Sequence, residues 1–147
     1  MDHQIRKATL SDIGIIKQIS DDSFTHPWSE KQFTDGFSSG FQHFFVCEAG
    51  GKIIGFIALS SVAGDCEILN VAVLPDHRKS GIGQALVKAA EEFFVSRNGE
   101  NIFLEVRKSN INAISLYEKC GFEKISERKN YYSSPKEDAL IYTKRLK

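Results

Sequence analysis

An apolar run that ends in a glycine-bearing turn constrains the fold of this chain more than any other segment. The run 67–74 has the composition of a buried strand, and it stops at Pro75. Beyond the turn, apolar residues recur at helical spacing from Ile82 to about Arg97. The residues of the turn are Arg78, Lys79, Ser80, Gly81, Ile82, Gly83 and Gln84. A strand, a tight turn and an amphipathic helix in this order predict a sheet that packs against helices.

The remaining segments predict a mixed sheet with helices between its strands. Ser29 and Asn110 are expected to cap the N-termini of two helices, and Gly121 is expected to end the second of them in a left-handed conformation. The predicted strands cover 4–8, 44–48, 53–60, 67–74, 102–106, 122–127 and 139–145, with a long polar loop before the last. The 147 residues suit a single domain, 1–147, of the α/β class.

Composition excludes several classes of function. The chain carries 19 basic and 19 acidic residues, so it has no general attraction for nucleic acid. No apolar run approaches the roughly 20 residues of a membrane helix, and the first residues do not resemble a secretory signal. Cys47, Cys66 and Cys120 form no Cys-x-x-Cys pair, and we expect reduced thiols in a cytoplasmic protein. The scattered histidines predict no metal site.

The glycine turn has the parts of an anion-binding site. A helix N-terminus presents unpaired amides and favours negative charge, and glycine lets a phosphate approach the backbone. A Walker-type loop does not fit, because Gly83 is followed by Gln84 and Ala85 rather than by Lys and Ser or Thr. A dinucleotide fingerprint does not fit either, because Leu86 stands where a small residue is needed. From these residues alone, a turn that only starts a helix remains an alternative.

The pattern Arg-x-x-Gly-x-Gly directly after an apolar strand resembles the CoA-binding signature of the Gcn5-related N-acetyltransferases. The resemblance extends over nearly the whole chain. It implies acetyl-CoA as cosubstrate, with its pyrophosphate on the turn from Arg78 to Gln84. It also implies a mixed sheet whose two central parallel strands are splayed, with the pantetheine bonded to the backbone of Val71, Ala72 and Val73.

A second cluster of chemically active residues begins in the strand 102–106. Glu105 lies on one face of this strand with Phe103 and Arg107, and a carboxylate in an apolar strand is costly to bury unless it is paired or used. An ion pair with Arg107 or Arg128 is the structural alternative. Amide formation from acetyl-CoA needs a neutral amine and a protonated thiol, and Glu105 and Tyr117 have the chemistry for these two tasks. For Tyr117 the alternative is packing in the core.

The motifs around this cluster narrow the resemblance to the RimI-type ribosomal-protein-alanine N-acetyltransferases. They are Pro27-Trp28-Ser29-Glu30, Leu104-Glu105-Val106-Arg107, Ser109-Asn110, Leu116-Tyr117-Glu118, Gly121-Phe122 and Arg128-Lys129-Asn130-Tyr131-Tyr132. The resemblance implies that Glu105 is the general base, that Tyr117 is the general acid and that Asn110 contacts the cofactor. It also implies the N-terminal alanine of a small-subunit ribosomal protein as acceptor. We expect a monomer or weak dimer.

Other residues extend or compete with this assignment. Glu67 is a second candidate base or an electrostatic partner of the amine. Cys120 is not expected to act as a nucleophile, because a helix C-terminus disfavours a thiolate. Trp28, Tyr131 and Tyr132 are expected to form the wall of the acceptor groove, with simple packing as the alternative. A small-molecule amine or a lysine side chain remains an alternative acceptor, and a non-catalytic acetyl-CoA-binding module remains an alternative function.

Overall fold

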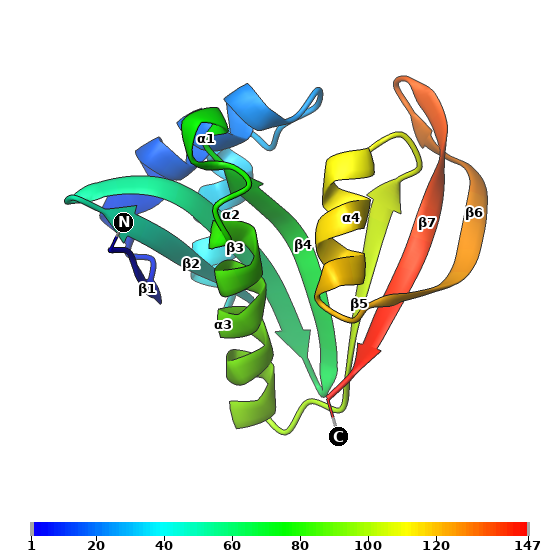
Figure 1. The fold of residues 1–147 in the computed structure, drawn as a ribbon. Coiled ribbons are helices and arrows are strands. Elements are labelled where there is room, and N and C mark those ends of the chain that lie inside the picture. Colours follow the sequence, from blue (N-terminus) through cyan, green and yellow to red (C-terminus); the bar gives the residue numbers. More distant parts are fainter. Residues whose placement is uncertain (1, 147) are drawn as a thin grey trace.

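A seven-stranded sheet runs through residues 2–146, the part of the chain that the computed structural model describes (Figure 1). The strand order is β1-β2-β3-β4-β5-β7-β6, with β4 parallel to β5 and the other neighbours antiparallel. The elements are β1 (Gln4–Lys7), α1 (Ile13–Ser23), α2 (Glu30–Ser39), β2 (Gln42–Ala49), β3 (Lys52–Val62), β4 (Asp65–Val73), α3 (Ile82–Ser96), β5 (Asn101–Arg107), α4 (Ile111–Lys119), β6 (Glu123–Ser133) and β7 (Lys136–Arg145). The predicted α/β order with a mixed sheet is confirmed.

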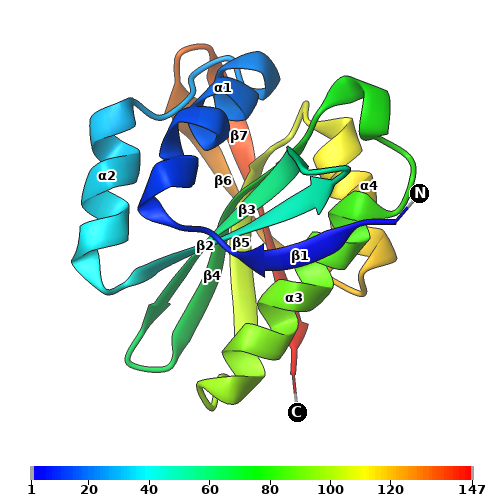
Figure 2. The ribbon, with the colours of Figure 1, turned by 90° about the vertical axis from the view of Figure 1, so that its left-hand side faces the viewer.

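Two helix pairs lie on opposite faces of the sheet (Figure 2). Helices α3 and α4 cover one face along its length, with Leu86 and Phe94 of α3 fully buried against the strands. Helices α1 and α2 pack on the other face, where the core consists of residues from β2, β3, β4 and the two helices, such as Ile16 and Phe33. We call β2–β4 the covered half of the sheet, and β5, β6 and β7 the open half.

Local signals in the sequence set the helix ends. The Ser29 hydroxyl accepts the backbone N–H of Gln32 at 3.1 Å, and the Gln32 side chain accepts the N–H of Ser29 at 2.8 Å, which makes a reciprocal cap for α2. Asn110 caps α4 by accepting the N–H of Ala113 at 3.2 Å. Gly121 follows α4 with a φ of 92°. All three predicted helix boundaries are confirmed.

The predicted long polar loop before the last strand is wrong. Strands β6 and β7 continue through it and pair as far as Tyr132 with Glu137 and Ser133 with Lys136. The segment looks like a loop because β6 is an edge strand, whose side chains are mostly exposed and therefore polar. An irregularity at Asn130, with a φ of 53°, interrupts the pairing without ending the strand.

Candidate functional site

The two parallel strands at the centre of the sheet separate soon after they meet. Strand β4 pairs with β5 only at Cys66 with Ile102 and Glu67 with Phe103. Beyond these pairs the strands diverge toward the C-terminal end of β4 (Figure 1). The predicted cofactor strand, residues 71–73, therefore keeps its pairing with β3 but has no partner in β5. One edge of its backbone is left without a partner strand, and its N–H and C=O groups, apart from the Val73 carbonyl, can bind an extended ligand.

The glycine turn lies at the end of this unpaired edge. Lys79 and Gly81 both adopt left-handed conformations, with φ of 61° and 86°, and α3 starts at Ile82. The first backbone bond of the helix is from the N–H of Ala85 to the carbonyl of Gly81, at 3.0 Å. Within residues 2–146 the backbone N–H groups of 79–84 donate to no acceptor, so they remain available to an anion.

The two glycines of the turn meet different surroundings. A Cβ on Gly81 would have no atom within 4 Å, so this glycine borders open space. A Cβ on Gly83 would lie 3.2 Å from the Leu116 side chain, so Gly83 lets α3 approach α4 closely. The sequence pattern did not predict this packing role. Arg78 braces the turn, because its Nε donates to the Val73 carbonyl at 2.8 Å.

Two carboxylates lie on neighbouring strands just where the strands begin to separate. Glu67 of β4 is opposite Phe103, and Glu105 follows two residues later on the same face of β5. Burial raises the pKa of Glu67, and the negative charge of Glu105 raises it further. Two neighbouring carboxylates favour the binding of a cation or the sharing of a proton.

Glu105 has one charged partner in the described structure. Nη1 of Arg128 lies 3.6 Å from its Oε2, an oxygen that is shielded from solvent and has no hydrogen bond among residues 2–146. Arg107, the other partner that the sequence suggested, pairs instead with Glu137 at 3.2 Å. The ion-pair alternative for Glu105 is therefore present in the structure as a long contact to Arg128. That contact leaves the carboxylate free to interact with a ligand.

Tyr117 lies on the opposite face of the sheet from Glu105. It is buried in α4 among the residues that pack against the sheet, next to the Phe122 ring. Burial raises the pKa of its hydroxyl, so Tyr117 holds its proton at neutral pH. Since β4 and β5 are separated here, a ligand that lies between the strands has access to groups from both faces. Asn110 begins the same helix, with one side-chain atom engaged in the cap.

The predicted acceptor-wall residues fall in two different places. Tyr131 and Tyr132 form an edge-to-face pair on β6, with ring centroids 5.1 Å apart. Two arginines of the open half lie over these rings: Arg107 over Tyr132 at 4.1 Å and Arg128 over Tyr131 at 5.1 Å. Trp28 lies between α1 and α2, where it packs against Phe33 with ring centroids 5.2 Å apart. The tyrosines thus contact the arginines near Glu105, whereas Trp28 belongs to the neighbouring core.

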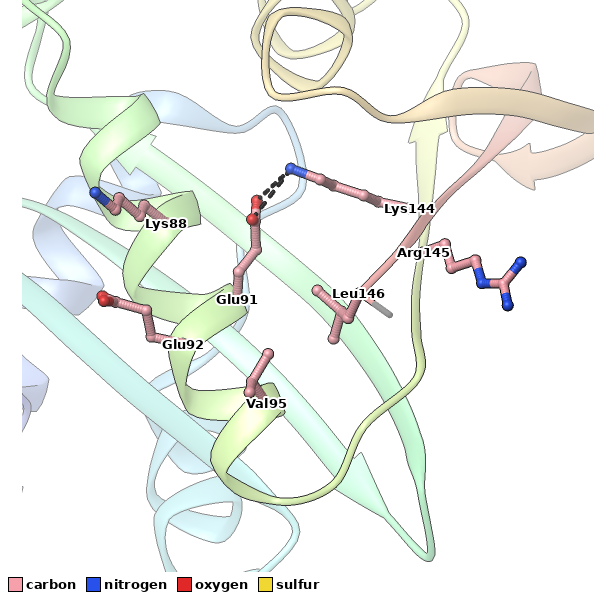
Figure 3. Close-up of a pocket in the computed structure, with 7 residues that line it drawn as sticks. All are labelled: Lys88, Glu91, Glu92, Val95, Lys144, Arg145 and Leu146. Atoms are coloured by element: carbon pink, nitrogen blue, oxygen red, sulfur yellow. Dashed lines mark hydrogen bonds and ion pairs between the residues drawn. The ribbon is translucent and has the colours of Figure 1, made fainter.

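A surface pocket of about 390 Å³ lies at the far end of α3 from the glycine turn. Figure 3 shows Lys144 of β7 reaching across it to Glu91 of α3. The Nζ of Lys144 lies 3.1 Å from both carboxylate oxygens of Glu91 and 2.6 Å from the carbonyl of Cys120. These bonds tie α3 to the end of α4 below the separated strands. Burial raises the pKa of the Cys120 thiol, which agrees with the expectation that it is not a nucleophile.

Neither a metal site nor a membrane-spanning helix is evident in the described part of the chain. Residues 2–146 contain no group of three or more His, Cys, Asp or Glu side chains that is arranged to hold a metal ion. None of the helices in the same range is both long enough and apolar enough to cross a bilayer.

A separated pair of parallel strands, with unpaired amides in the turn at its end and carboxylates beside it, is the arrangement that the resemblance to the Gcn5-related N-acetyltransferases implied. Residues 14–122 match the model of the Acetyltransferase (GNAT) family, and the chain belongs to this family. It is an acetyl-CoA-dependent N-acetyltransferase.

Relatives in bacteria and archaea match almost the full length. The [ribosomal protein bS18]-alanine N-acetyltransferase of Escherichia coli strain K12 is 33% identical over 139 residues, which cover 93% of each chain. An N-alpha-acetyltransferase of Sulfolobus acidocaldarius is 31% identical, over 96% of this chain and 91% of its own. The crystal structure of the ribosomal-protein-S18-alanine N-acetyltransferase from Escherichia coli superposes with a TM-score of 0.89 and covers 99% of this chain and 94% of that chain.

Proposed function

We propose that this enzyme transfers the acetyl group of acetyl-CoA to the N-terminal α-amine of a protein, and that its acceptor is the N-terminal alanine of ribosomal protein bS18. The observation that carries this proposal is the 33% identity, over 93% of both chains, to the Escherichia coli enzyme named for that reaction. The open face beside Glu67 and Glu105 supports it, because an extended chain terminus can reach the carboxylates there.

The acetyl-CoA site combines the unpaired strand with the glycine turn. Val71, Ala72 and Val73 offer backbone groups to the pantetheine, in the way that a strand receives an added extended chain. The amides from Lys79 to Gln84 bind the pyrophosphate, and Gly81 leaves the space that the phosphate needs. The charges of Arg78 and Lys79 and the free side-chain atoms of Asn110 complete the site.

Glu105 acts as the general base in a direct transfer from acetyl-CoA to the amine. It takes a proton from the acceptor's ammonium group, and the neutral nitrogen attacks the thioester carbonyl carbon. The C–S bond breaks, the sulfur leaves with a proton from Tyr117, and the second proton that the nitrogen sheds replaces the one Tyr117 gave. An α-amine has a reference pKa near 8, against about 10.4 for lysine, so deprotonation costs roughly 3 kcal/mol less for an α-amine. A single carboxylate is therefore better matched to a protein N-terminus than to a lysine side chain.

Tyr117 acts as the general acid for the departing thiolate. Its raised pKa keeps the hydroxyl protonated until the sulfur develops negative charge. Glu67 lies on the same face as Glu105, where the acceptor binds, and burial raises its pKa. It is the electrostatic partner of the incoming amine. Tyr131 and Tyr132 line the acceptor groove with apolar rings and polar tips, and Trp28 supports its far wall through the packing of α1 and α2.

A panel of amines tests this function. The protein is incubated with acetyl-CoA and equal concentrations of an N-terminal alanine peptide, the same peptide with a blocked N-terminus and an internal lysine, and a polyamine. Products are identified by mass spectrometry. We expect acetylation of the free N-terminus, with at least tenfold higher kcat/KM than for either other amine. Exclusive acetylation of the lysine or of the polyamine would contradict the proposed acceptor.

A further inference from the structure

Arg128 reaches across a strand to contact the proposed base. Strand β7 lies between β5, which carries Glu105, and β6, which carries Arg128. The residue of β7 that pairs with both Arg128 and Arg107 is Ala139, and it is fully buried. A small side chain at this position leaves room for the arginine to lie over the sheet. Nη1 of Arg128 thereby comes within 3.6 Å of Glu105 Oε2.

The ion pair between Arg128 and Glu105 is weak. The Arg128 side chain is 59% exposed, and its approach to Glu105 includes no hydrogen bond among residues 2–146. An ion pair whose cation is mostly exposed and which lacks a hydrogen bond contributes little to stability. The same guanidinium lies 5.1 Å from the centroid of the Tyr131 ring, with which it can make a cation–π interaction when it leaves Glu105.

Arg107, the neighbouring arginine of the open half, is held by more contacts than Arg128. Arg107 donates to the Pro135 carbonyl at 3.1 Å and to the Glu137 carboxylate at 3.2 Å, and it lies over Tyr132. Its side chain is only 25% exposed. Arg107 is therefore fixed by three contacts, whereas Arg128 is held by one long ion pair and one ring.

The position next to Glu105 is the one that an acceptor amine needs. A free α-amine is largely an ammonium ion at neutral pH. It has to approach the same carboxylate that Arg128 contacts, on the same open face of the sheet. A single oxygen without other partners favours one cation over two, because two cations side by side repel each other.

We propose that Arg128 occupies the place of the acceptor's ammonium group in the free enzyme and is displaced toward Tyr131 when the acceptor binds. This inference rests on the proposed function, since it takes Glu105 as the group that receives the amine. Arg128 is then a positioning residue that keeps the Glu105 carboxylate oriented between turnovers. The acetylated product carries no charge, so Arg128 returns to Glu105 and competes with the product, which favours its release.

The test compares Arg128→Met with Lys129→Met. Lys129 is the next residue on β6, is 72% exposed and pairs with Glu127 and Asp138 rather than with Glu105, so its substitution removes the same charge from the same strand. With saturating acetyl-CoA and an N-terminal alanine peptide, we expect Arg128→Met to lower the acceptor KM about two- to fivefold, the size of one exposed ion pair. The kcat should stay within about twofold, and Lys129→Met should change neither constant.

Two further measurements separate displacement from a structural effect. Arg128→Lys keeps the cation and should restore a KM close to that of the wild type. A peptide with N-terminal glycolyl in place of the amine has no ammonium group, so its inhibition constant should be the same for the wild type and Arg128→Met. An unchanged or raised KM in Arg128→Met, or an equal change in the inhibition constant, would overturn the proposal. If the wild type acetylates a different amine, the proposed function fails, and the same variants are compared on that amine.

Discussion

The covered half and the open half of the sheet differ in how completely helices cover them and in the charged groups that they expose. Strands β2–β4 bury both faces, under α1 and α2 on one side and α3 on the other. In the open half only the face under α4 is buried, and the opposite face carries a half-exposed Phe103 with Glu105 and Arg128. The covered half supplies most of the stability of the fold, and the open half supplies Glu105 and the cations beside it, which a substrate can reach.

The same contrast appears in the ion pairs. At the edge of the covered half, Arg6 of β1 joins Asp12 at 2.8 Å and Glu48 of β2 at 2.7 Å, through hydrogen-bonded contacts that are mostly shielded from water. In the open half the contact of Arg128 with Glu105 is 3.6 Å long, makes no hydrogen bond among residues 2–146, and has a 59% exposed arginine. Short, shielded pairs hold a structure together, whereas a long pair without a hydrogen bond can exchange its partner.

The largest difference between the halves is expected for two phenylalanines. Phe33 is fully buried and packs edge-on against Phe44 and Phe56, so Phe33→Ala should lower the free energy of unfolding by about 3–5 kcal/mol. Phe103 is 42% exposed, and Phe103→Ala should cost less than about 1 kcal/mol. Urea unfolding of both variants measures this. Equal costs would show that the open half is as important for stability as the covered half.

A smaller effect is expected at the shielded ion pair. Hydrogen bonds from Arg6 lower the pKa of Asp12 from 3.8 to about 2, so Asp12→Asn should cost about 2 kcal/mol at pH 7. Because the folded-state pKa is the lower one, this stabilisation is complete above pH 3.8 and is lost as the pH falls toward 2. The difference between wild type and variant should roughly halve at pH 3.

Asp21→Asn is the matched control for that substitution. Asp21 lies on the adjoining helix, is 44% exposed and pairs with Lys17 one turn away. Its replacement should change the free energy of unfolding by less than about 0.5 kcal/mol at either pH. A pH-independent cost for Asp12→Asn would contradict the assigned role of the Arg6 pair.

A smaller stability effect than at Asp12, with a separate effect on binding, is expected at Gly81. Gly81 and Gly64 both have left-handed φ, of 86° and 89°, and both border open space. Either one changed to Ala should cost about 1 kcal/mol of stability from backbone strain. Only Gly81→Ala should also weaken acetyl-CoA binding, by about three- to tenfold, because its Cβ enters the space of the pyrophosphate. Calorimetric titration measures the affinity of both variants for acetyl-CoA. Equal affinities of Gly81→Ala and Gly64→Ala would contradict the placement of the pyrophosphate at Gly81.

The fold was readable from the sequence wherever local chemistry determined it. The caps at Ser29 and Asn110 and the left-handed Gly121 depend on nearby residues, and each was predicted. The course of β6 was not readable, because an exposed edge strand has the polar composition of a loop. The burial of Phe94 rather than Phe93 depends on how α3 rotates against the sheet, which only tertiary packing determines.

The candidate site was predictable in its residues but not in its contacts. The alternation of β5 predicted which face carries Glu105. Its partner Arg128 comes from a strand two positions away in the sheet, and sequence separation gives no preference between Arg128 and Arg107. The role of Gly83 depends on Leu116 of another helix. Such contacts follow from the register of distant segments, for which the sequence contains no local signal.

Glu105→Gln, measured for both activity and stability, tests the division between the two halves most directly. Glu123→Gln, an exposed substitution of the same kind on β6, is the control. We predict that Glu105→Gln lowers kcat about 100- to 1000-fold, while acetyl-CoA affinity and the free energy of unfolding, to within about 0.5 kcal/mol, stay unchanged. Retention of more than a tenth of the wild-type kcat, or a loss of activity that parallels a loss of stability, would contradict the account.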